Sequence, residues 1–138
     1  MKKKNFIIIL ASLFLVSFGA NAQGKTVKTI LFDGGSCELY ELSKNSMFAP
    51  ADMQKDEKAF MLRLKCSLKK NAGKEALSVL YNNGRFVAPD GKLYKAGASA
   101  ILNNEDGLIY SLIVAVPESV DVAKLKFVYN KQVMLLSK

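Results

Sequence analysis

The sequence predicts an all-β protein of about eight short strands, a number and spacing typical of β-sandwiches and barrels. Short segments of alternating apolar and polar residues recur along the chain, separated by turns rich in Gly, Asn and Asp. We expect no helix longer than two turns. The clearest strand spans 59–69, where Phe60 and Leu62 share one parity while Arg63 and Lys65 share the other. It should lie in an antiparallel sheet with its apolar face on the core.

The first 22 residues have the pattern of a secretory signal peptide. Lysines at 2–4 precede an apolar run over 6–18, and a small-x-small cleavage site follows at 20–22. An uncleaved membrane anchor is the alternative, but the run is short for a spanning helix. No Cys stands at the cleavage point, which argues against a bacterial lipid anchor. We therefore expect a periplasmic or secreted domain, residues 23–138, that keeps no stable membrane anchor.

The charge of the chain does not indicate a nucleic-acid partner. The sequence has 20 basic and 12 acidic residues, a net charge of +8, and removal of the three signal lysines leaves +5. The remaining lysines are spread along the chain, whereas a nucleic-acid interface needs a dense basic stripe with stacking aromatics. A modest net charge mostly serves solubility.

Two short strands and an irregular segment are expected before the clearest strand. The first strand, 26–33, has β-branched and aromatic residues, and a Gly-rich turn at 33–36 leads into a second strand at 37–42. Residues 43–58, interrupted by Pro50, should form a loop or a single helical turn.

A hairpin loop and two tight turns are expected after the clearest strand. Residues 69–75 suit the loop, and Leu77, Val79 and Tyr81 alternate as a returning strand should. Asn82-Asn83-Gly84 can supply the positive φ of a turn into a short strand at 86–87. Pro89-Asp90-Gly91 predicts a turn from which 92–94 pair back.

The C-terminal part predicts four further strands. The nine-residue segment 108–116 is the most apolar and suits a strand buried on both faces. The other expected elements are a weak strand at 96–102, an exposed acidic turn at 103–107, a crossover at 118–124, and a hairpin of 125–129 and 132–136 joined by Asn130-Lys131.

Several of these segments together resemble a known family. They are a strand and polar turn from Leu64 to Gly73, the turn Asp90-Gly91-Lys92-Leu93-Tyr94, the strand end Val116-Pro117, and the strand start Lys124-Leu125-Lys126-Phe127. On them, residues 59–129 resemble the immunoglobulin-like secreted domain of unknown function found in bacterial exported proteins and lipoproteins. That group includes the mycobacterial immunoprotective secreted antigen. The resemblance implies an immunoglobulin-like antiparallel β-sandwich of about seven to eight strands and transfers no catalytic residue.

The two cysteines, Cys37 and Cys66, have two interpretations. An oxidising compartment allows a disulfide between them. Two buried free thiols acting as small hydrophobic side chains are the alternative. Both stay open, since a bridge requires Cα atoms within bonding range. The chain has no His and no CxxC pair, which argues against a zinc site.

Two turns carry candidate ligand groups, each with a simpler structural explanation. Asn103, Asn104, Glu105 and Asp106 could offer oxygen ligands to Ca²⁺, but they lack the spacing and distal Glu of an EF-hand loop. An exposed acidic hairpin is the better explanation of these residues. Asp90 and Tyr94 could face a ligand, but turn capping by Asp90 and packing of Tyr94 at a sheet edge account for both. We therefore expect neither a metal nor a cofactor.

The sequence predicts a protein that is not an enzyme. Asp33, Glu38, Glu41 and Asp90 could meet in space, but general acid–base catalysis usually recruits His, and the chain has none. The leading hypothesis is an exported binding or accessory module with an unknown protein or envelope partner. The alternatives are an exported small-ligand or Ca²⁺-binding domain and a carboxylate-dependent hydrolase.

Overall fold

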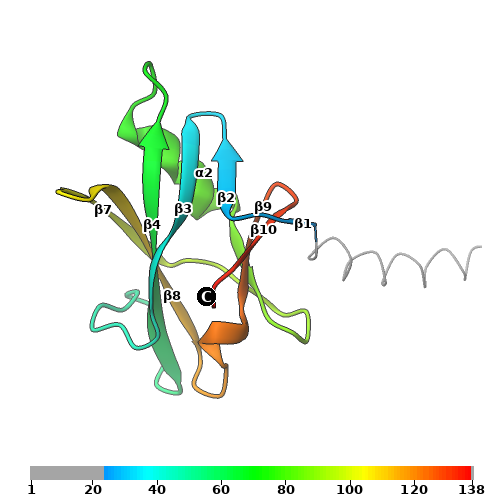
Figure 1. The fold of residues 1–138 in the computed structure, drawn as a ribbon. Helices are drawn as coiled ribbons and strands as arrows, with labels where there is room; N and C mark the ends of the chain where they lie inside the picture. Colours follow the sequence, from blue (N-terminus) through cyan, green and yellow to red (C-terminus); the bar gives the residue numbers. More distant parts are fainter. Residues whose placement is uncertain (1–23, 138) are drawn as a thin grey trace, which may run out of the picture.

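Two β-sheets pack against each other in the computed structural model, which describes residues 24–137 (Figure 1). The predicted signal peptide lies outside these residues. The described chain is mostly β, as predicted, and its two five-stranded sheets are consistent with a β-sandwich. The strands are β1 (Lys25–Thr26), β2 (Thr29–Phe32), β3 (Gly35–Ser43), β4 (Glu57–Leu68), β5 (Arg85–Val87), β6 (Leu93–Tyr94), β7 (Ala98–Asn104), β8 (Gly107–Pro117), β9 (Lys126–Tyr129) and β10 (Gln132–Leu135).

The sheets, which we call A and B, are built from strands distant in sequence. Sheet A has the order β1–β10–β9–β5–β6. β1 pairs parallel to β10, and the other neighbouring strands of sheet A pair antiparallel. Sheet B has the order β2–β3–β4–β8–β7 and is antiparallel throughout. The chain passes between the sheets after β1, β4, β6 and β8.

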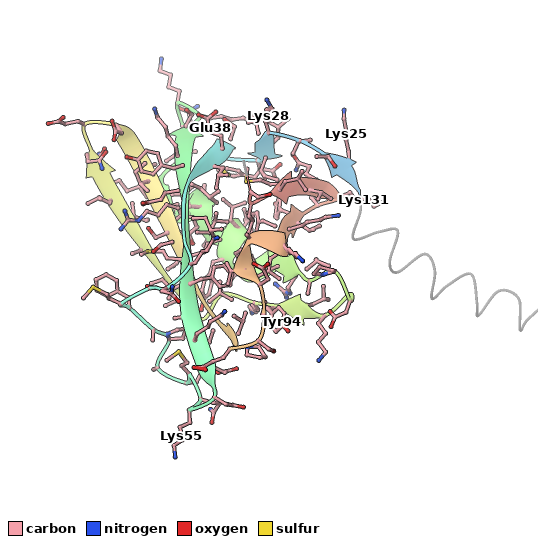
Figure 2. All side chains as sticks on the ribbon, turned by 60° about the horizontal axis from the view of Figure 1, so that its bottom comes forward. Lys25, Lys28, Glu38, Lys55, Tyr94 and Lys131 are labelled. Carbon is pink, nitrogen blue, oxygen red and sulfur yellow. The ribbon has the colours of Figure 1, made fainter. Side chains whose placement is uncertain are left out.

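The core lies between the sheets and is centred on β4 and β8. Phe60 and Leu62 of β4 are fully buried, while Lys65 on the other parity is exposed, as the alternation predicts. The Phe60 ring meets Phe86 of sheet A edge-on, with ring centroids 5.2 Å apart and an interplanar angle of 84°. Phe127 of β9 stacks behind Phe86 at 5.1 Å. Figure 2 shows the side chains that fill this space.

Part of the outer face of sheet B, the face turned away from sheet A, is also buried. Met61 and Ile113 pair on this face, and both are buried. The loop 44–56 lies beside them, because the Ser46 N–H donates to the Ala59 carbonyl at 2.9 Å. The segment predicted to be irregular is thus a loop without a helical turn. The prediction that 108–116 is buried on both faces is confirmed by β8.

The predicted returning strand at Leu77, Val79 and Tyr81 is wrong. The structure has a 3-10 helix η1 (Lys74–Leu77) that continues into the short helix α2 (Ser78–Asn83). Leu77 and Leu80 are its fully buried residues, and their spacing of three places both on one helix face. The segment offers Leu77, Val79 and Tyr81 to a period of two and Leu77 with Leu80 to a helical period, which is why alternation alone misleads over so short a segment.

The turns were predicted with one error. Asn130 and Lys131 both have positive φ, 47° and 63°, as a two-residue hairpin turn requires. Gly84, in contrast, has a φ of −73° and ends α2. It is required for space, since a Cβ there would lie 2.4 Å from the Leu80 carbonyl oxygen and 2.5 Å from the Phe127 ring. None of the helices in residues 24–137 is long and apolar enough to cross a membrane.

Candidate functional site

The four outer strands of the two sheets differ in how their free backbone groups are protected. An outer strand presents unpaired N–H and C=O groups to which another chain can add a strand. In sheet A the outer strands are β1 and β6, which have only two residues each. In sheet B they are β2, with four residues, and β7, with seven. Short outer strands offer little surface for pairing, so the edges that could pair with another chain belong to sheet B.

The edge of β2 is covered by a side chain from the other sheet. The Gln132 Nε2 donates to the Leu31 carbonyl at 2.8 Å, and the Leu31 N–H donates to the Gln132 Oε1 at 2.7 Å. This amide therefore makes the two hydrogen bonds that a neighbouring strand would make. The centre of the β2 edge is thereby satisfied.

The edge of β7 is long, uncharged and open. Its sequence, ASAILNN, contains no charged residue and no Pro, the residues that commonly protect an edge. Ile101 and Leu102 are 42% and 51% exposed. Within residues 24–137, no strand pairs with the side of β7 that faces away from β8. Figure 1 shows β7 as the outermost ribbon of sheet B, with solvent beyond it.

The pairing register shows which backbone groups of β7 point outward. The two-residue turn between β7 and β8 makes Asn104 and Gly107 a hydrogen-bonded pair, and such pairs alternate along an antiparallel ladder. The even-numbered residues of β7 therefore bond to β8. The N–H and C=O groups of Ser99, Ile101 and Asn103 point away from the sheet. These three residues form the available hydrogen-bonding edge.

Opposite charges flank the two ends of β7. Lys95, three residues before the strand, is exposed, and so are Glu105 and Asp106 directly after it. The Asp106 carboxylate accepts a hydrogen bond of 2.5 Å from the Tyr40 hydroxyl, which reaches it from β3. That hydrogen bond raises the pKa of Tyr40. The turn after β7 is therefore held against the outer face of sheet B, while Glu105 is left facing solvent.

The candidate Ca²⁺ ligands lie at the end of β7 and in this turn, and two of them are engaged in holding the turn. The Asn104 Oδ1 accepts from the Asp106 N–H at 2.8 Å, and Asp106 is engaged by Tyr40. Asn103 lies in β7, and Glu105 points to solvent. No group of three or more His, Cys, Asp or Glu side chains that could hold a metal occurs among the described residues.

The other candidate residues lie apart from one another. Asp90 caps its own turn, its Oδ1 accepting from the Lys92 N–H at 3.0 Å, and Tyr94 pairs with Phe86 at the edge of sheet A. Glu41 forms a salt bridge of 3.1 Å with Arg63 on the outer face of sheet B. Glu38 lies on β3, and Asp33 lies in the β2–β3 turn. Three of the four carboxylates considered for catalysis thus belong to the β2–β3 hairpin of sheet B, whereas Asp90 belongs to the β5–β6 turn of sheet A.

Cys37 and Cys66 are directly opposite each other on β3 and β4, and both are free and buried. The Lys69 N–H donates to the Gly34 carbonyl, so the pairing alternation makes Cys37 and Cys66 a non-hydrogen-bonded pair, the closest kind across a ladder. The hydrogen bond to Cys66, together with burial, raises the pKa of Cys37 far above its usual range. The same hydrogen bond lowers the pKa of Cys66.

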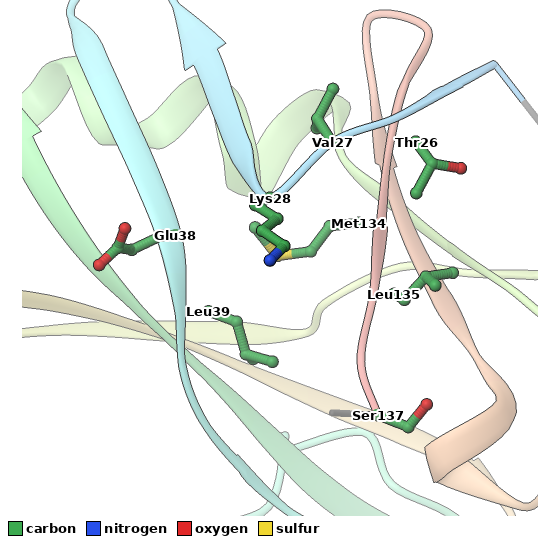
Figure 3. Close-up of a pocket in the computed structure, with 8 residues that line it drawn as sticks. All are labelled: Thr26, Val27, Lys28, Glu38, Leu39, Met134, Leu135 and Ser137. Carbon is green, nitrogen blue, oxygen red and sulfur yellow. The ribbon is translucent and has the colours of Figure 1, made fainter.

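A cavity of about 580 Å³ opens between β3 and β10, and no motif in the sequence indicates it. Its apolar lining residues are Val27, Leu39, Met134 and Leu135, and its polar ones are Thr26, Lys28, Glu38 and Ser137. Figure 3 shows Leu39 and Met134 pointing into the space between the strands, while the Glu38 carboxylate turns to the far side of β3. The cavity has room for a small apolar ligand.

The comparisons with known proteins leave the fold and the β7 edge as the basis for interpretation. No family model matches the chain, and neither the curated proteins nor the solved structures contain a match. The structure defines a two-sheet β protein with one long open edge. The sequence predicted a weak strand at 96–102, where the structure has β7. The lack of charged residues in this segment was the only available signal that it would form an exposed edge.

Proposed function

We propose that this chain is an exported binding or accessory module with an immunoglobulin-like β-sandwich, and that it contacts a protein partner through the free edge of β7. The open edge is the observation that carries this proposal. β7 has seven uncharged residues, of which six are exposed and three present outward backbone groups, whereas the comparable edge, β2, is covered by Gln132. Exposed edges of this kind otherwise favour uncontrolled association, so a binding role gives a reason for one to be retained.

The N-terminal sequence and the family resemblance support the same proposal. Residues 1–22 carry the pattern of an export signal. The secreted immunoglobulin-like domains that residues 59–129 resemble transfer no catalytic residue, in agreement with a role in binding. The two five-stranded sheets are compatible with that class of fold.

The mode of binding is strand addition. An extended segment of the partner pairs with the outward N–H and C=O groups of Ser99, Ile101 and Asn103, and these backbone bonds supply affinity. Side chains on the two faces of β7 supply selectivity. Leu102 lies on the outer face, where it pairs with Ile109, and Ile101 lies on the face turned toward sheet A, where it pairs with Tyr110.

A pull-down from the native envelope with tagged residues 23–138 tests this function. These residues include all strands and the core of the part of the chain that the structure describes. Asn103→Pro removes one outward N–H without breaking a bond to β8, since the Asn103 N–H points to solvent. We expect this variant to lose the partner that the unmodified chain recovers. Leu93→Lys, on the short outer strand of sheet A, is the matched control and should retain it. Equal recovery by Asn103→Pro would show that β7 is not the binding edge.

A further inference from the structure

We propose that the edge of β7 is occupied by β7 of a second copy of this chain, paired antiparallel about a two-fold axis. This inference rests on the proposed function of β7 as a binding edge and names its partner. The two B sheets would then form one continuous ten-stranded sheet across the dimer. Such an isologous contact uses the same edge of both copies and therefore closes.

Charge complementarity is the first argument for a second copy. In an antiparallel pair the start of one β7 meets the end of the other. The start is preceded by the exposed Lys95, and the end is followed by the exposed Glu105. Each dimer therefore brings Lys95 of one copy to Glu105 of the other, twice.

The outward backbone groups limit the possible registers. Only odd-numbered residues present free groups, so hydrogen-bonded pairs across the dimer must join odd-numbered residues. With Ala100 on the two-fold axis, Ser99 of one copy bonds Ile101 of the other. The regular ladder ends at Ala98, since the Gly97 N–H donates to the Ile113 carbonyl at 2.9 Å. This register still places the segment that carries Lys95 of one copy beside the turn that carries Glu105 of the other. Backbone pairing and charge pairing thus agree on one arrangement.

Apolar surface is the second independent argument. Met47 and Phe48 are the most exposed large apolar side chains of the described residues, at 96% and 64%. They belong to the loop 44–56, which reaches the start of β7, where a Cβ on Gly97 would lie 2.8 Å from Pro50. In the proposed register Leu102 of one copy lies opposite Ala98 of the other. The exposed Leu102 of one copy therefore lies at the start of β7 of the other copy, beside that copy's loop 44–56.

The protection of the other edges limits the assembly to two copies. After β7 is paired, the outer strands left are β1, β6 and β2, of which the first two are very short and the third is covered by Gln132. An edge contact buries less surface than a standard interface, so we expect reversible dimerisation in the micromolar range.

Sedimentation of residues 23–138 over a range of concentrations tests the proposal. We expect a monomer–dimer equilibrium with no larger species. Lys95→Glu and Glu105→Lys each replace attraction by repulsion at two places and should each raise the dimer dissociation constant about tenfold. The double variant Lys95→Glu/Glu105→Lys should restore it. Lys92→Glu makes the same charge change beside β6 and should leave dimerisation unchanged.

Two results would overturn the dimer. One is a monomer at all concentrations from a chain whose circular dichroism shows a folded β protein. The other is a dimer unaffected by Asn103→Pro and not restored by the charge-swapped pair, because that dimer would use a different face. Neither result removes the proposed function. That fails separately, if the envelope partner is recovered equally well by Asn103→Pro.

Discussion

The side-chain amide of Gln132 in β10 is paired with the backbone of Leu31 in β2, 101 residues earlier in the chain, through hydrogen bonds of 2.7 and 2.8 Å. The contact joins an outer strand of sheet B to sheet A. It satisfies one donor and one acceptor that an edge strand leaves open. β2 and β7 are the two longest outer strands, and this contact is what distinguishes them.

We predict that Gln132→Ala lowers the free energy of unfolding by about 1 to 2 kcal/mol, because the two hydrogen bonds to Leu31 and a longer one to the Tyr129 carbonyl are lost. It should also add species larger than a dimer, since a second edge becomes available. Urea unfolding and sedimentation measure the two effects. Gln132→Glu should destabilise comparably, because it keeps the acceptor but loses the donor to the Leu31 carbonyl. Gln54→Ala, which loses only a bond within the loop 44–56, should change stability little. An unchanged stability of Gln132→Ala would contradict this account of the edge.

Local signals predicted most of the strands and turns, whereas the order of the strands needed the structure. The turns at Asp90 and at Asn130-Lys131 were predictable because their chemistry lies in adjacent residues. The alternation in β4 was predictable for the same reason. The segment around Leu77 and Leu80 was not, since a short apolar run fits both a strand and a helix.

The candidate site depends on contacts between distant residues, which is why the sequence did not reveal it. The composition of β7 is visible in the chain, but its place at the edge of sheet B follows from the pairing of β4 with β8. The hydrogen bonds by which Gln132 covers the edge of β2 also join residues that are far apart in the sequence. The proximity of Cys37 and Cys66 follows from the β3–β4 register, which no local motif announces.

The cysteine pair predicts a disulfide under oxidising conditions. We expect oxidised glutathione to convert Cys37 and Cys66 to a disulfide with release of two molecules of reduced glutathione. The bridge closes a loop of roughly 30 residues and should raise the free energy of unfolding by about 3 kcal/mol. Mass spectrometry of the unreduced chain and urea unfolding with and without reductant measure this. Cys37→Ser should show no such response to oxidant. A folded chain that keeps both thiols after prolonged oxidation would count against it.

The Tyr40–Asp106 hydrogen bond predicts a pH dependence of stability. It raises the pKa of Tyr40 above its ordinary value of 10.0. As pH rises past that value, the unfolded chain releases this proton before the folded chain does. The contribution of the hydrogen bond is therefore complete below pH 10 and declines as pH rises toward the folded pKa. The difference in stability between the unmodified chain and Tyr40→Phe should shrink over that interval.

Ultraviolet absorbance of tyrosinate gives a direct measurement of the same group. The folded chain should contain a tyrosine that ionises late because of Asp106, and Tyr40→Phe should remove it. Asp106→Asn should return the pKa of Tyr40 toward its ordinary value, since the acceptor charge is lost. An identical titration of all three chains would contradict the prediction.

Two glycines separate a requirement for space from a requirement for backbone conformation. A Cβ at Gly84 would overlap the Leu80 carbonyl and the Phe127 ring, although its φ of −73° suits any residue. Gly91 has a φ of +89° with nothing within 4 Å of an added Cβ. We predict that Gly84→Ala destabilises by about 2 to 3 kcal/mol through overpacking at the core. Gly91→Ala should cost about 1 kcal/mol through left-handed strain alone. Urea unfolding of both variants measures the difference, and the reverse order of stabilities would show that α2 does not pack on Phe127 as described.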